Sequence, residues 1–179
     1  PQGAVASPLL ANVYLHYVLD TWANHWRKEH ARGDVIIVRY ADDFVMGFQY
    51  RSEAEQFLKD LQERLGQFGL SLHPDKTRLI EFGRYAARSR EQRGAGKPET
   101  FNFLGFTHIC GQTRLNRKFT VLRKPIAKRM AATLKLIRDK LWERRHEPVQ
   151  KLGEWLGSVV RGWLQYFAVP GTSFRIEFF

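Results

Sequence analysis

This sequence of 179 residues lacks several features that mark particular protein classes. It has one cysteine, Cys110, which excludes an internal disulfide and a cysteine-based zinc site. It has no apolar run long enough to span a membrane, and its first residues lack the basic and apolar segments of a secretory signal. We therefore expect a cytoplasmic protein without a membrane partner, and the single cysteine fits a reducing compartment.

Acidic residues are also scarce, and the resulting positive charge is localised. The chain has 18 acidic residues against 29 lysines and arginines, a net charge of +11. Residues 84–145 hold 17 of these bases and only four acids, whereas the rest of the chain is close to neutral. A basic block of this kind favours a polyanionic partner such as a nucleic acid. Its polar, glycine-rich stretch at 88–97 is equally typical of a disordered loop.

The remaining composition is that of a folded protein. Apolar residues make up 44% and aromatic residues 13% of the chain, enough for a buried core. The length allows one domain or two small ones.

The pattern along the chain predicts helices and short strands in the first two thirds, followed by two helices. Ser7 and Ser52 stand where N-caps of two helices are expected. Helices are predicted at 7–30, 52–68, 125–145 and 149–167, a hairpin at 35–50, and extended segments at 70–72, 77–82, 101–106 and 119–122. This order predicts an α+β fold with an antiparallel sheet, then an α-helical region, with a boundary near 122–125.

Two adjacent acids stand at the tip of the predicted hairpin. Asp42 and Asp43 lie between two apolar, β-prone runs, so they fall at or beside the turn. Aspartate is common in turns, and that alone can explain the pair. Two neighbouring carboxylates nevertheless repel each other unless a cation lies between them, and their hard oxygens suit Mg²⁺. The residues by themselves leave both interpretations open.

Four motifs in a fixed order resemble one protein family. They are Pro-Gln-Gly to Ala-Asn at 1–12, Tyr-Ala-Asp-Asp-Phe at 40–44, His-Pro-Asp-Lys-Thr at 73–77, and Phe-Leu-Gly-Phe at 103–106. Together they resemble the reverse transcriptase of group II intron-encoded proteins. The segment 161–167 is similar to the thumb of that family, also called the maturase or X region. The resemblance extends from Pro1 to about Gly171.

The resemblance implies a division of the chain and an RNA-directed DNA polymerase activity. Residues 1–122 would form part of the palm, 123–171 a truncated helical thumb, and 172–179 an atypical tail. The fingers and the first palm strand, which carries another metal-binding aspartate, would be missing. We therefore expect a fragment that does not synthesise DNA alone. The alternative is a non-catalytic intron RNA-binding module or a decayed remnant.

The resemblance also assigns catalytic roles. Asp42 and Asp43 would hold two Mg²⁺ ions for attack of a primer 3′-hydroxyl on a dNTP. Lys76 would lie near the triphosphate, and the alternative is a surface lysine after a turn. The predicted dNTP pocket contains Gln2, Gly3, Tyr40 and Ala41.

The expected macromolecular partners are an RNA template, a DNA primer and the group II intron RNA whose splicing the family promotes. Gly105 would let the primer backbone approach closely, or would serve the packing of the aromatic residues around it. The predicted phosphate contacts are Lys124, Lys128, Arg129, Lys135 and Arg138. The sequence leaves open whether an exposed palm face drives self-association.

Overall fold

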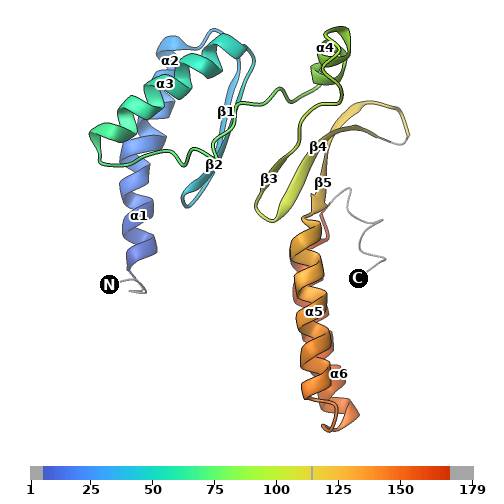
Figure 1. Cartoon of the computed structure of the whole chain (residues 1–179). Coiled ribbons are helices and arrows are strands. Elements are labelled where there is room, and N and C mark those ends of the chain that lie inside the picture. Colours follow the sequence, from blue (N-terminus) through green and yellow to red (C-terminus); the bar gives the residue numbers. More distant parts are fainter. Residues whose placement is uncertain (1–5, 114, 170–179) are drawn as a thin grey trace. The chain divides into compact units, whose positions relative to one another are not determined.

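A computed structural model describes residues 6–113 and 115–169, and it divides the chain into two units, Pro1–Ile80 and Glu81–Phe179 (Figure 1). The fold is α+β with antiparallel sheets, which confirms the predicted fold class. No helix within the described residues is long and apolar enough to cross a membrane. The proposed palm and thumb boundary near residue 122 is a functional division and stays a prediction.

The first unit packs helices against one face of a β-hairpin. In chain order its elements are α1 (Ser7–Leu15), the π-helix η1 (His16–Thr21), α2 (Trp22–His30), β1 (Val35–Tyr40), β2 (Asp43–Phe48) and α3 (Arg51–Gln67). The first three form a continuous helical segment, as predicted for residues 7–30, but with a π-helical turn inside it. Neither serine acts as an N-cap, because Ala6 and Tyr50 occupy the cap positions without a side-chain bond.

The core of this unit lies between the helices and the hairpin. Val18, Leu19 and Leu61 are almost completely buried, and Trp26 adds its ring, with its indole Nε1 donating to Asp60 at 2.7 Å. The hairpin contributes the side chains of one face. These are Ile37, Phe44, Met46 and Phe48. Because strand side chains alternate between faces, packing one face on the helices leaves the other face open.

Gly33 lies just before the first strand of the hairpin, where neighbouring side chains leave no room for a Cβ. A Cβ added at Gly33 would lie 2.8 Å from the Cβ of Gln49, closer than real atoms approach. Gln49 also accepts a hydrogen bond from the Asp34 amide through its side chain, at 3.1 Å. Gly33 therefore lets the two ends of the hairpin close against each other.

The second unit contains a three-stranded antiparallel sheet and two long helices. Its elements are α4 (Ala86–Gln92), β3 (Phe101–Phe103), β4 (Phe106–Gln112), β5 (Phe119–Pro125), α5 (Ala127–Glu143) and α6 (Val149–Phe167), with strand order β3-β4-β5. The start of α5 and the end of α6 meet at the same turn. The Ile126 amide donates to the Gly105 carbonyl at 3.1 Å, and the Tyr166 hydroxyl donates to the Leu104 carbonyl at 2.9 Å. The two helices are therefore antiparallel neighbours.

One local prediction for this region was wrong. The segment 101–106 is not one strand, because Leu104 and Gly105 both have positive φ, 47° and 78°, and turn the chain into a hairpin. Two consecutive residues with positive φ are typical of a type I′ turn. In the sequence, only Gly105, at the second central position, indicated this turn. A disordered loop was one of two interpretations left open for the basic stretch at 88–97. The stretch begins inside helix α4, where Arg90 pairs with Glu99 and Arg93 with Glu81. The segments 70–72 and 77–82, predicted as extended, belong to neither sheet of the described chain.

The burial of α3 in the first core gives a stability prediction. Leu61→Ala leaves a cavity beneath the helix and should lower the free energy of unfolding by about 2–5 kcal/mol. Urea unfolding followed through the NMR signals of residues 6–80 measures it. Leu9→Ala is the matched control, since Leu9 is 67% exposed and its loss should cost less than about 0.5 kcal/mol. Equal losses in both variants would contradict the assignment of this core.

Candidate catalytic hairpin

The acid pair lies at the tip of the hairpin formed by β1 and β2. Tyr40 pairs with Asp43, so Ala41 and Asp42 form a two-residue turn between the strands. Both aspartates are exposed, and no hydrogen bond or ion pair within the described part of the chain neutralises either carboxylate. Two adjacent, unneutralised acids raise the local negative potential, which makes the tip attractive to a cation.

The turn has a backbone conformation that alanine rarely adopts. Ala41 has a φ of 53°, in the left-handed region where a Cβ crowds the following carbonyl oxygen. Such conformations cost about 1–2 kcal/mol and persist only where neighbouring contacts impose them. Here the contact comes from Arg39, whose Nη1 donates to the Ala41 carbonyl at 2.8 Å.

Arg39 is itself fixed by the first helical segment. Its Nε and Nη2 donate to the two carboxylate oxygens of Asp20 at 2.7 and 2.6 Å, and its Nη1 also donates to Asn12 at 2.9 Å. The arginine side chain is 13% exposed. Hydrogen bonds from Arg39 hold the pKa of Asp20 below its ordinary value of 3.8, although partial burial opposes the shift. The same carboxylate raises the pKa of Arg39, so both groups are charged at neutral pH.

The face of the hairpin opposite the core is exposed. It carries the side chains of Ile36, Val38 and Tyr40, which are 65%, 47% and 66% exposed, and by strand alternation Asp43 belongs to it. Tyr40, predicted to contact the dNTP, is therefore accessible and paired with Asp43 in the register. Ala41, predicted for the same pocket, lies in the turn. Gln2 and Gly3 lie outside the described residues.

Lys76 occupies an exposed turn after α3. Its amide and that of Thr77 donate to the His73 carbonyl at 3.2 and 2.9 Å, which forms a compact turn at 73–77. Within the described residues no hydrogen bond or ion pair joins Lys76 to the acid pair. Its place beside a bound triphosphate stays a prediction.

The predicted nucleic-acid contacts all belong to the second unit. A Cβ added at Gly105 would meet Tyr166 at 3.4 Å and Arg129 at 3.5 Å, so this glycine accommodates side chains of α5 and α6. Lys128 and Lys135 are seven residues apart on α5, on the side opposite the buried Ile137. Of the remaining predicted contacts, Lys124 is partly exposed and the Arg138 side chain is 75% exposed.

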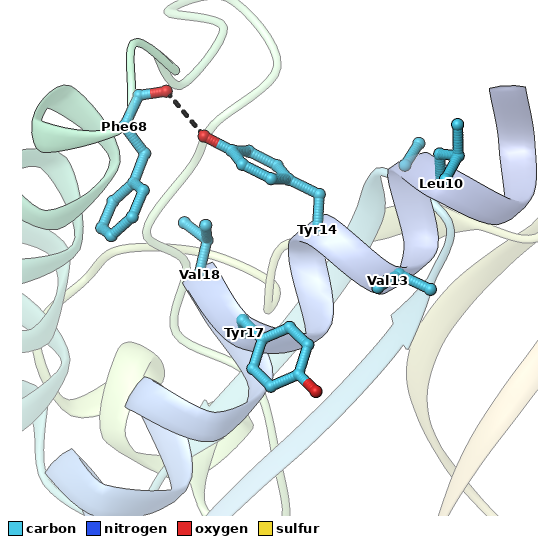
Figure 2. A pocket seen from close by; sticks show the side chains of 7 residues that line it. Leu10, Val13, Tyr14, Tyr17, Val18 and Phe68 are labelled. Carbon is cyan, nitrogen blue, oxygen red and sulfur yellow. Dashed lines mark hydrogen bonds between the residues drawn. The ribbon is translucent and has the colours of Figure 1, made fainter.

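An apolar hollow also lies in the first unit, but its chemistry differs from that of the hairpin tip. It has a volume of about 580 Å³ and is lined by Leu10, Ala11, Val13, Tyr14, Tyr17, Val18 and Phe68. Figure 2 shows Tyr14 reaching across it, with its hydroxyl donating to the Phe68 carbonyl at 2.9 Å. The lining carries no ionic group, so the hollow suits an apolar surface and not a nucleotide.

The donor set at the hairpin tip fits Mg²⁺ only in part. Carboxylate oxygens are ligands that Mg²⁺ prefers, and no cation in the described part of the chain occupies those of Asp42 and Asp43. Within residues 6–113 and 115–169, however, no group of three or more histidine, cysteine, aspartate or glutamate side chains forms a metal cluster. Asp42 and Asp43 can hold a metal ion only with further ligands, such as water or phosphate oxygens.

Sequence reasoning missed Asn12, Asp20 and Arg39 at this site. The sequence did carry one signal, because Arg39 continues the alternation of Val35 and Ile37 on the face that packs against the helices. A charged residue in that position requires an anionic partner. The partner, 19 residues away in a π-helical turn, has no sequence signature.

The pair of Asp20 and Arg39 predicts a particular acid dependence. Because the pKa of Asp20 is lowered on folding, the unfolded chain binds more protons at low pH, and the stabilisation is present above about pH 4. It is lost as the pH falls through the lower, folded pKa. Asp20→Asn should lower the free energy of unfolding at neutral pH by about 1–3 kcal/mol and flatten its acid dependence. Urea unfolding across pH 2–7 measures both, and an unchanged acid profile would contradict the assignment.

Part of the sequence matches a known protein family. Residues 1–108, more than half of the chain, match the family described as Reverse transcriptase (RNA-dependent DNA polymerase). The match includes the hairpin, the turn at 73–77 and the Leu104–Gly105 turn, and it ends before α5. No curated protein matches the sequence significantly.

Proposed function

The chain belongs to the reverse transcriptase (RNA-dependent DNA polymerase) family, and we propose that it supplies the catalytic hairpin and a nucleic-acid-binding helical region of such a polymerase. The observation that carries this proposal is the exposed acid pair at the hairpin tip. No cation among the described residues pairs with Asp42 or Asp43, while the strand before them is fixed to the helical core through Arg39. A rigidly held pair of free carboxylates is what nucleotidyl transfer requires of a protein.

The proposed reaction joins a primer 3′-hydroxyl to the α-phosphate of a dNTP and releases pyrophosphate. Mg²⁺ held by Asp42 and Asp43 would stabilise the negative charge on the attacking and leaving oxygens. The chain's own contribution is to fix these carboxylates on a short turn and to keep them exposed to the substrates. Tyr40 and the Ala41 backbone lie beside them and are proposed to contact the dNTP, together with Gln2 and Gly3. Lys76 is proposed to neutralise charge on the triphosphate.

Nucleic-acid binding is assigned to the second unit. We propose that Lys124, Lys128, Arg129, Lys135 and Arg138 contact phosphates of the RNA template and DNA primer, and that the functional thumb begins near residue 123. Exposed lysines on the outer side of α5 support this role. Gly105 is proposed to lie near the primer, although the space at its Cα is bordered by Tyr166 and Arg129.

The finer assignment is to a group II intron. We propose it from the four ordered motifs, with intron RNA as a further partner, a role in splicing and a cytoplasmic location. Self-association would use the apolar hollow of α1 as its candidate surface. A second candidate function is RNA binding without catalysis. The absence of a third acidic ligand from the described residues favours it, because two carboxylates alone hold two divalent ions poorly.

Primer extension tests the proposed activity. The assay uses poly(rA)/oligo(dT), dTTP and Mg²⁺, with this chain alone and with this chain in a polymerase that supplies a third metal-binding carboxylate. We expect extension only when that third carboxylate is present, because two carboxylates hold two divalent ions poorly, and we expect its loss by a factor of at least about 10³ in Asp42→Ala. Asp34→Ala, at the opposite end of the same hairpin, is the matched control and should retain activity.

The outcomes separate the two candidate functions. Extension that survives Asp42→Ala would refute the role of the hairpin. No extension in either form, together with tight RNA binding that weakens steeply with salt, would favour the non-catalytic RNA-binding function.

The lysines of α5 give a separate binding prediction. Lys128→Ala with Lys135→Ala should weaken RNA binding at all sequences and reduce the slope of log K against log salt by about 1–2. Fluorescence anisotropy with a labelled RNA across a salt series measures the slope. Lys59→Ala, an exposed lysine on α3, is the control. An unchanged slope in the double variant would exclude α5 from the contact surface.

A further inference from the structure

Arg39 makes four hydrogen bonds that connect three separate parts of the first unit. Two go to Asp20 in η1, one to Asn12 in α1 and one to the Ala41 carbonyl in the turn. The guanidinium has five N–H donors in a rigid planar fork, so this arrangement uses four of them. Because the fork is rigid, fixing two of its corners on Asp20 fixes the direction of the bond to Ala41.

The position of Asp20 depends on an unusual helical turn. The segment His16–Thr21 is π-helical, and the Thr21 hydroxyl donates to the His16 carbonyl five residues earlier, at 2.9 Å. Single π-helical turns inside α-helices are rare and occur frequently at functional sites. Here the turn carries the carboxylate that binds Arg39, while His16 lies 3.6 Å from the same carboxylate.

The other end of the connection is the strained turn. The Ala41 conformation is unfavourable for a residue with a Cβ, and Arg39 binds the carbonyl of that same residue. The bond comes from a charged donor, which makes it stronger than a neutral hydrogen bond. A single partly buried arginine, Arg39, thus connects two unfavourable features: the π-helical turn that carries Asp20 and the left-handed Ala41.

We propose that Arg39, anchored by Asp20, is a positioning residue that holds Ala41 in its left-handed conformation and so sets the direction of the two carboxylates that follow it. The importance of Arg39 for catalysis rests on the proposed function of Asp42 and Asp43. Its effect on the conformation of the turn is independent of that function, because it is expected in the chain without metal. Arg39 touches neither carboxylate and acts only through the backbone of Ala41.

Amide hydrogen exchange in the metal-free chain tests the holding of the turn. Arg39→Lys keeps the positive charge but removes the planar guanidinium. Amide exchange at residues 40–43 should then become about tenfold faster, while exchange at the core residues of α3 should stay unchanged. Asp20→Asn should act in the same direction. The matched controls are Arg51→Lys, which alters an exposed pair with Glu55, and Asp34→Asn at the far end of the hairpin.

A rescue variant separates positioning from general support of the fold. Glycine adopts positive φ without strain, so Ala41→Gly in the Arg39→Lys background should return the exchange at residues 40–43 most of the way to the wild-type rate. A general loss of packing would not be repaired by this change. Unchanged exchange in Arg39→Lys, or no rescue by Ala41→Gly, would overturn the inference.

Manganese binding connects the turn to the proposed metal site. Mn²⁺ should broaden the amide signals of residues 41–44 in the wild-type chain, and Arg39→Lys should raise the apparent Kd about tenfold or more without changing the signals that broaden. A Kd that Arg39→Lys leaves unchanged would overturn the positioning role. No broadening in the wild-type chain would instead refute the proposed metal site, and the exchange experiment would still decide whether Arg39 holds the turn.

Discussion

The bidentate pair between Arg39 and Asp20 is the contact on which the candidate site depends. It lies where the hairpin meets the first helical segment, with the arginine 13% and the aspartate 26% exposed. Burying the Arg39 guanidinium there without an anionic partner would lower the stability of the fold, and so would burying the Asp20 carboxylate without the arginine. Once paired, the two groups fix β1 to η1 and leave two further donors for Asn12 and the Ala41 carbonyl. The turn that carries Asp42 is therefore connected through Arg39 to the first helical segment.

The rest of the first unit makes that rigidity possible. The hairpin has only two strands, and such a hairpin is marginally stable by itself in water. Phe44, Met46 and Phe48 bury one face of it against Phe57, Leu61 and the helical segment. The opposite face stays exposed from Ile36 to Tyr40. The same packing thus stabilises the strands and leaves the face next to Asp43 exposed.

Much of this fold followed from local patterns, whereas the contacts that position the site did not. Alternating apolar residues predicted the hairpin, and helical spacing predicted the helices, because both patterns reflect one buried face. The Leu104–Gly105 turn was missed because the run from Phe101 to Phe106 is mostly aromatic and apolar, with only Asn102 polar, and resembles a single strand. The π-helical turn was missed because no breaker marks residues 16–21, and its carboxylate is matched to an arginine 19 residues away. The acid pair could be predicted, but not the arginine that holds its turn.

Whether a metal ion binds at the hairpin tip is decided by anomalous scattering from Mn²⁺ in crystals of the protein with a primer–template and a dNTP. We expect a manganese peak about 2.0–2.2 Å from carboxylate oxygens of Asp42 or Asp43, beside the triphosphate, with Arg39 still bound to the Ala41 carbonyl. Nucleic acid and nucleotide bound with manganese at another place in the chain, and none at the hairpin tip, would contradict this expectation.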